Sequence, residues 1–397
     1  MNGRKIGEST RQQLQQYSQL PDRVIQEKLP LPAVELELTQ VSDRPPRGCQ
    51  RAGDVNLHRA RQHVGGLDSI RFICAAVVVF SHCNKPMILD ADATSSIPLR
   101  VLIGVYNNAF SASAAVIAFF VISGFCIHYS GLFLRTRSSW IGFLARRWVR
   151  IWLPLLGALA IGRQLGMPVT LYTESVLWSL YAEIIYYTLY PAIRAVLPVV
   201  GWRWLILGSF LGSMGVALTD PGASGFPSYG VELNWLLGLP CWLLGCLVAE
   251  WYFYGPDLST QKDAERRSRV HFRIWGYRML VWGTAVVASV LRFHCGVGHP
   301  WTLPFFAILV AFWLKKEIIY HSRHASLAWM EWLGKATYSM YIIHLPISRW
   351  IVQHELLTFG EFINWVALMM IILAATLVFY YAIELPSHRL ARRIPAT

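Results

Sequence analysis

The sequence predicts an all-α, polytopic integral membrane protein: a bundle of about ten transmembrane helices with both termini in the cytoplasm. Hydrophobic residues make up 54% of the 397 residues and charged residues only 15%, whereas a soluble domain carries roughly a quarter charged residues. From residue 67 onward, apolar runs recur that are long enough to span a hydrocarbon core. Positive charge also alternates between successive predicted loops, as it does in multi-pass membrane proteins.

The net charge is +13. The positions of the Lys and Arg residues along the chain account for this excess of positive charge. With the N-terminus in the cytoplasm, the predicted inner loops hold sixteen Lys and Arg residues and the outer loops five. This bias follows the positive-inside rule, so the basic balance indicates membrane lipids as partners and no nucleic acid. The predicted location is the inner, or plasma, membrane of the cell.

Two regions are predicted. Residues 1–65 are polar, rich in Gln, Arg and Pro, and lack an apolar run, which is typical of a disordered cytoplasmic arm and not of a secretory signal. Residues 66–393 form the predicted membrane domain. The seven cysteines form no CxxC pair, so we expect neither a disulfide framework nor a zinc site, and no other metal is predicted.

Ten candidate spans follow one another in the membrane domain. Several are shorter than about 20 residues or contain proline and charge, as is common for helices enclosed by other helices in a bundle. The candidate spans lie near 67–84, 109–130, 148–166, 175–195, 201–218, 231–252, 276–293, 301–319, 329–350 and 362–384.

The first span, LDSIRFICAAVVVFSHC, carries ionisable side chains that a membrane helix tolerates only with a partner or a function. Arg71 and His82 are eleven residues apart, which puts them on one helix face about 16 Å apart. Asp68 lies three residues before Arg71 and can pair with it. We therefore predict a polar stripe at a functional site. The alternative is that Arg71 reaches the inner interface and His82 caps the outer helix end.

Small and basic residues mark the next two spans. In FFVISGF, Ser123 and Gly124 interrupt an apolar run, so that either a substrate or a packed helix can approach. In RRWVRIWLP, Arg147 and Arg150 lie one turn apart near the start of a span. Arginine binds phosphate well, and an anion complements a helix start, so these residues are candidates for binding an anionic cofactor. The alternative is positive-inside anchoring.

Two later segments carry further candidates. Glu183 lies inside the apolar segment LWSLYAEIIYYTLYP, where a carboxylate needs donors or a cation. It is predicted to hold an arginine, to orient a histidine, or to form a structural ion pair. Tyr338, Tyr341 and His344 recur every three residues in TYSMYIIHLP, and they predict either support for a site or a hydrogen-bonded core cluster. Glu384 reads as a helix end at the inner interface.

The chain contains no nucleophile elbow, Walker loop or HExxH motif, which argues against three common catalytic classes. Taken in order, LDSIRFICAAVVVFSHC, FFVISGF, RRWVRIWLP, WSLYAE and YSMYIIHLP instead resemble the landmarks of the acyltransferase 3 family of bacterial membrane proteins. The resemblance covers roughly residues 66 to 393. The arm before residue 66 is not part of the family pattern.

This resemblance implies an O-acyltransferase that moves an acyl group, commonly acetyl, from acyl-coenzyme A to a hydroxyl of a cell-surface or exported carbohydrate. It implies that His82 and Arg71 are the essential pair, that Arg147 and Arg150 contact the donor, and that Glu183 is a buried carboxylate of the catalytic site. Two alternatives stay open: acylation of a lipid, peptide or antibiotic, and transport of a lipid-linked saccharide. Against transport, we find no inverted repeat.

Overall fold

The computed structural model describes residues 64–83, 95–134, 137–255 and 266–395, without the side chains of residues 137–138 and 266–272. The predicted N-terminal arm, residues 1–65, lies outside these ranges apart from its last two residues. Within the described ranges, every element of secondary structure is a helix, as predicted.

The helices of the first half are α3 (Leu67–His82), α4 (Ile97–Asn108), α5 (Ala112–Gly131), α6 (Arg137–Gln164), α7 (Val169–Tyr172), a π-helical turn η2 (Thr173–Leu177) and α8 (Trp178–Ala217). The helices of the second half are a 3₁₀ turn η3 (Phe226–Tyr229), α9 (Gly230–Tyr254), α10 (Arg266–His294), α11 (His299–His321), α12 (Ala328–Gly334), α13 (Thr337–Gln353), α14 (Glu361–Phe379), a π-helical turn η4 (Tyr380–Glu384) and α15 (Leu385–Arg392).

Each predicted span overlaps a helical segment. Five helical segments are long and apolar enough to cross a membrane, so the chain is a multi-pass membrane protein, and the full number of crossings stays a prediction. These segments are Ala112–Gly131, Val169–Ala217, Phe226–Tyr254, Arg273–His294 and Glu361–Arg392.

Several boundaries differ from the prediction. Helix α6 begins at Arg137, eleven residues before the predicted start of its span, so Arg147 and Arg150 lie within the helix and not at its start. The spans predicted near 175–195 and 201–218 belong to one run, α8, which is broken at Gly201. Gly201 has φ 75°, in the left-handed region that glycine adopts without a steric penalty. The span predicted near 329–350 is divided into α12 and α13, and α4 forms in a segment that was expected to be an outer loop.

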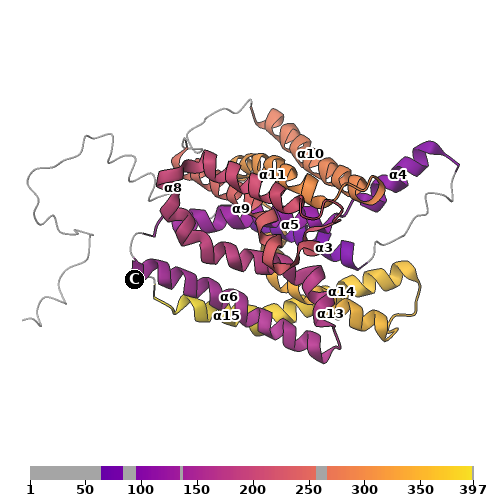
Figure 1. Cartoon of the computed structure of the whole chain (residues 1–397). Helices are drawn as coiled ribbons and strands as arrows, with labels where there is room; N and C mark the ends of the chain where they lie inside the picture. The colour runs from indigo at the N-terminus through magenta and orange to yellow at the C-terminus, as the bar shows by residue number, and fades with distance from the viewer. Residues whose placement is uncertain (1–63, 84–94, 135–136, 256–265, 396–397) are drawn as a thin grey trace, which may run out of the picture. The chain divides into compact units, whose positions relative to one another are not determined.

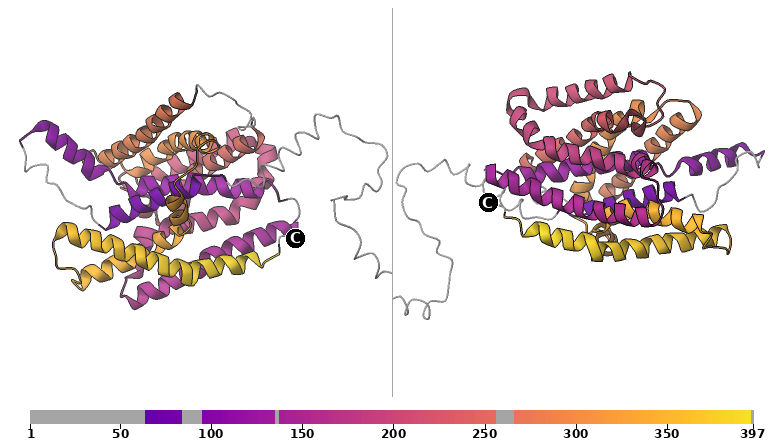
Figure 2. Two further views of the ribbon diagram at one scale, coloured as in Figure 1. Left: turned by 180° about the vertical axis from the view of Figure 1, so that it is seen from behind. Right: turned by 60° about the horizontal axis from the view of Figure 1, so that its bottom comes forward.

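Helix α5 lies at the centre of the described bundle. It packs against α3, α9 and α11, while α13 packs against both α3 and α14, and α15 packs against α6. Figures 1 and 2 show α3 and α5 between the helices α6, α13, α14 and α15 on one side and α9 to α11 on the other. The short, polar helix α3 is therefore enclosed by other helices, which is where its ionisable side chains can find partners.

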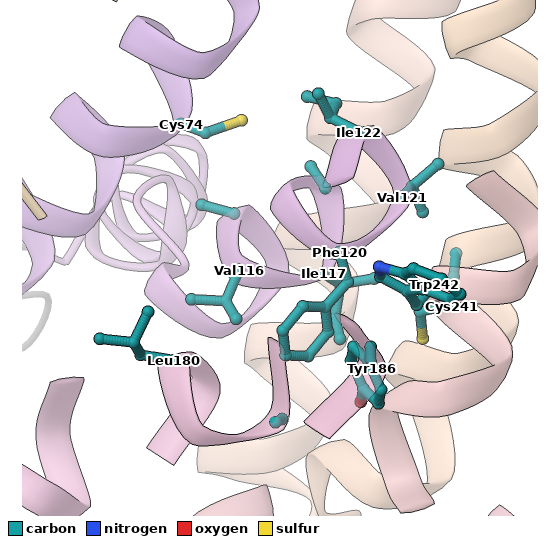
Figure 3. Packing of buried hydrophobic residues seen from close by; sticks show 14 of the residues in the cluster. Cys74, Val116, Ile117, Phe120, Val121, Ile122, Leu180, Tyr186, Cys241 and Trp242 are labelled. Atoms are coloured by element: carbon teal, nitrogen blue, oxygen red, sulfur yellow. The ribbon is translucent and has the colours of Figure 1, made fainter. Parts of the chain in front are cut away.

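Two glycines let α5 and α9 approach closely. A Cβ atom added at Gly124 would lie 1.9 Å from the carbonyl oxygen of Trp242, and one added at Gly245 would lie 1.9 Å from that of Val121. The backbones therefore touch at both points, as small residues allow in membrane helices. Figure 3 shows the buried side chains around this contact, with Trp242 next to Phe120. Of the two expected roles of Gly124, approach of a substrate or of a packed helix, the structure shows the packed helix.

We predict that Gly124→Ala lowers the stability of the protein by about 1 to 3 kcal/mol. The new methyl group would overlap the backbone of α9, so the two helices would have to move apart. The melting temperature in detergent, measured by fluorescence-detected size exclusion, checks this. Gly212→Ala in α8 is the matched control, because no atom lies within 4 Å of the added Cβ there. Equal melting temperatures for the two variants would contradict the close α5–α9 contact.

Candidate active site

A cavity of about 840 Å³ opens inside the bundle, within the size range of small-molecule sites. Eight of the ten predicted site residues line it: Asp68, Arg71, Ser123, Arg147, Arg150, Glu183, Tyr338 and Tyr341. They come from α3, α5, α6, α8 and α13, so residues distant in the sequence meet at one place. His82 and His344 are not among the lining residues.

On α3, Asp68 and Arg71 form the ion pair that their spacing predicts. Asp68 Oδ1 lies 2.7 Å from Arg71 Nη1, and Arg71 Nη2 donates to the Cys126 sulfur over 3.0 Å. Arg71 and His82 are not brought together, since α3 is one helix and eleven residues separate them by about 16 Å. Arg71 therefore belongs to the cavity and does not contact His82.

The start of α3 is held by a carboxylate from α12. Glu331 Oε1 accepts hydrogen bonds from the Gly66 amide over 2.9 Å and from Ser69 Oγ over 2.8 Å. Burial acts to raise the pKa of Glu331, but these hydrogen bonds outweigh it and the net effect lowers the pKa. A negative charge at a helix N-terminus is stabilised by the helix dipole, so Glu331 anchors the helix that carries Arg71 and His82.

Glu183 on α8 is held by hydroxyl groups. Its Oε1 accepts a hydrogen bond from Ser123 Oγ over 2.5 Å and another from Tyr187 Oη, and Ser123 and Tyr187 also lie 3.0 Å apart. In the part of the chain that the structure describes, no arginine or histidine forms an ion pair with Glu183. Two hydroxyl groups therefore satisfy this carboxylate on the cavity wall, in place of the expected arginine or histidine.

The arginines of α6 differ in their partners. Arg146 donates to the carbonyl oxygens of Ile394 and Pro395, whereas Arg147 and Arg150 face the cavity. Arg147 makes only a long hydrogen bond of 3.4 Å to Ser130 Oγ. Among the described residues, none forms a hydrogen bond or an ion pair with the half-buried Arg150. A cation in this position is a ready site for an anion.

Helix α15 adds groups to the cavity that the sequence analysis did not assign. Glu384, His388 and Arg392 lie four residues apart and share one helix face, which is the signal that identifies them. The expectation that Glu384 ends a helix at the interface is wrong. Its side chain is 2% exposed and accepts hydrogen bonds from the backbone amide and the hydroxyl of Ser339, because α14 continues through η4 into α15.

A second, smaller cavity of about 260 Å³ shares part of this wall. Arg147, Arg150 and Arg392 line both cavities, and Arg146 lines the second one. Four guanidinium groups therefore gather in one place, between α6 and α15. Such a cluster matches the geometry of phosphate groups, which arginine binds in a bidentate manner.

The two histidines absent from the cavity wall form a pair of their own. His82 Nδ1 lies 2.9 Å from His344 Nε2, and the rings stack with an interplanar angle of 16°. Tyr341, one turn before His344 on α13, lines the cavity with its ring centre 6.3 Å from that of His344. The histidine pair thus lies one helical turn beyond the cavity. Of the three residues predicted to share a face, Tyr338 and Tyr341 line the cavity, and His344 contacts His82 beyond it.

These features define a multi-pass membrane protein with an arginine-lined cavity next to a pair of stacked histidines, of which His344 is buried. The model of a known family, described as an acyltransferase domain, matches residues 64–384, most of the chain. The chain therefore belongs to the acyltransferase 3 family, and family membership supports an acyltransferase enzyme. No curated protein and no solved structure matched the chain.

We predict that Glu331→Gln lowers stability by about 0.3 to 1 kcal/mol, the range for a partly exposed carboxylate at a helix N-terminus. Because the folded pKa is lowered, the carboxylate stabilises the protein above its usual pKa of 4.5 and loses this effect as the pH falls through the folded value. The difference in melting temperature between wild type and variant should therefore be full near pH 7 and shrink below about pH 4.5. The control is Glu355→Gln, an exposed residue that follows the end of α13 and lies in no helix. A difference that does not depend on pH would contradict the charged cap.

Proposed function

We propose that this protein is an inner-membrane O-acyltransferase that moves an acyl group, in the simplest case acetyl, from acyl-coenzyme A to a hydroxyl of a cell-surface or exported carbohydrate. The observation that carries the proposal is the cavity itself, whose wall includes both the arginine cluster and Tyr341, next to the histidine pair. Family membership supports acyl transfer, and the chemistry of the cavity supports the donor.

Coenzyme A carries several phosphates and is cytosolic, so its anionic end is expected at the basic, cytoplasmic side. Arg147 and Arg150 lie ten and thirteen residues after the first residue of α6, and the positive-inside rule assigns the basic first half of that helix to the cytoplasmic side. Arg392 joins them from α15. With the phosphates at these guanidiniums, the pantetheine arm extends along the wall formed by Tyr338 and Tyr341, and the thioester approaches the histidine pair.

His82 is the proposed general base. The acceptor hydroxyl attacks the thioester carbonyl while His82 takes its proton, which gives a tetrahedral intermediate. When the intermediate collapses, the carbon–sulfur bond breaks and His82 returns the proton to the departing thiolate. The products are the ester and free coenzyme A. Histidine suits this role because its unperturbed pKa of about 6.5 allows it both to take and to return a proton near neutral pH.

A second route with the same residue is transient acylation of His82 before the acceptor binds. Purified protein incubated with radiolabelled acetyl-coenzyme A and no acceptor distinguishes the two. Label that stays on the protein in wild type and is absent in His82→Ala supports the acyl carrier. Label that never becomes protein-bound, together with transfer when the acceptor is added, supports the general base.

We predict that His82→Ala abolishes transfer, with a loss of at least about 10²-fold, as expected when a general base is removed. The measurement is ester formation on the acceptor in a strain that lacks the native copy. His354→Ala is the matched control, because His354 is exposed directly after α13 and its contacts are with the backbone carbonyl and the ring of Trp350. Full activity of His82→Ala in a protein that folds normally would exclude His82 as the base.

We predict that Arg150→Gln raises the KM for acyl-coenzyme A by about tenfold or more, which corresponds to about 1.4 kcal/mol. Removal of one guanidinium weakens phosphate binding and leaves kcat less affected. Arg163→Gln is the control, since Arg163 is exposed in the last turn of the same helix. An unchanged KM for Arg150→Gln would move the donor site away from this cluster.

The acceptor is tested in cells. Surface glycans from strains with and without the gene are compared for ester groups, and we expect the esters to be lost while the glycan remains. Loss of the whole glycan would favour transport of a lipid-linked saccharide. Unchanged glycans together with a protein that hydrolyses acetyl-coenzyme A would favour a lipid, peptide or antibiotic acceptor.

A further inference from the structure

The contacts of the histidine pair determine which nitrogen carries each proton. His344 Nδ1 lies 3.1 Å from the carbonyl oxygen of Met340, and a carbonyl oxygen can only accept. His344 Nδ1 therefore carries a hydrogen and donates it. A neutral imidazole has one such hydrogen, so Nε2 of His344 is an acceptor. His344 is fully buried, and its hydrogen-bond partners include no carboxylate, which favours the neutral ring.

The tautomer of His82 follows from that of His344. The 2.9 Å contact between His82 Nδ1 and His344 Nε2 needs one hydrogen, and His344 Nε2 has none to offer. His82 Nδ1 must therefore be the donor. Its other nitrogen, Nε2, then carries a free lone pair, which is the form that a general base or a nucleophile requires.

The backbone around His344 is fixed by a contact from another helix. Pro346 lies inside α13 and has no amide hydrogen, so the carbonyl of Ile342 loses its normal helical partner. Tyr172 Oη donates to this carbonyl instead. The turn that carries His344 is thereby tied to α7, which fixes the backbone from which the ring extends.

We propose that His344 is a positioning residue that holds His82 in the Nδ1-protonated tautomer and stabilises the imidazolium after His82 has taken the proton. This role rests on the proposed function of His82. It is the role that a carboxylate plays in a Ser-His-Asp triad, where the wrong tautomer costs several orders of magnitude in rate. Here a neutral imidazole accepts the hydrogen bond, which avoids placing a negative charge in the bundle.

Three substitutions at one position test the proposal. In His344→Gln the amide oxygen reaches the place of Nε2 and can still accept from His82 Nδ1. In His344→Asn the amide is too short to reach His82, although it can bind the Met340 carbonyl. In His344→Phe neither contact is possible. We expect His344→Gln to retain at least tenfold more kcat than the Asn and Phe variants, with the KM for acyl-coenzyme A unchanged in all three.

A spectroscopic measurement separates positioning from a structural effect. The protein is labelled with ¹⁵N-histidine, and the His82 signals are assigned by their loss in His82→Ala. Wild type and His344→Gln should show a non-protonated Nε2 on His82, whereas His344→Phe should show a mixture of tautomers. Equal kcat values for Gln, Asn and Phe, or rates that follow only the melting temperatures, would overturn the positioning role. Full activity of His82→Ala would instead overturn the proposed function.

Discussion

The need to give every ionisable group on α3 a partner inside an apolar bundle governs the arrangement of the other helices. The helix has only 16 residues and carries Asp68, Arg71 and His82, so exposure to lipid would be costly along most of one face. In the bundle, a specific contact satisfies each of these groups. Asp68 neutralises Arg71, Glu331 caps the helix start, and His344 meets His82. The contacts of Glu331 and His344 require that α12 and α13 lie beside α3.

The close contact between α5 and α9 makes room for this arrangement. With Gly124 and Gly245 in backbone contact, α5 is held against α9 on one side and presents Ser123 to the cavity on the other. Ser123 then satisfies Glu183 together with Tyr187. Neighbouring residues on α5 therefore have different tasks: the glycine packs a helix, and the serine completes a polar wall.

The arginine cluster and the histidine pair lie in different places around the cavity. The guanidiniums gather between α6 and α15, and the histidine pair lies one turn beyond Tyr341. A long donor with phosphates at one end and a thioester at the other fits this separation, because a single molecule then reaches both regions. The geometry also places Arg71 on the cavity wall, paired with Asp68 and without direct contact to His82.

Much of the site could be predicted from the sequence, because ionisable residues in apolar segments are rare and each one marks a place where burial must be compensated. This logic identified Arg71, His82 and Glu183, and helical spacing identified the pairing of Asp68. It failed for Glu384, since the basic residues around it resemble an ordinary inner tail, and only the continuation of α14 into α15 carries that carboxylate into the cavity.

The sequence by itself determined the class of the protein, the positions of its helices and most of the polar residues, since composition and helical periodicity are local properties. The tertiary structure alone decided which of these residues meet. His82 and His344 are 262 positions apart, and Ser123 and Glu183 are 60 apart, so no spacing rule connects them. Helix packing connects them, and that depends on how faces from distant segments fit together. Whether His82 presents a free nitrogen is therefore a property of the bundle and not of the helix on which it lies.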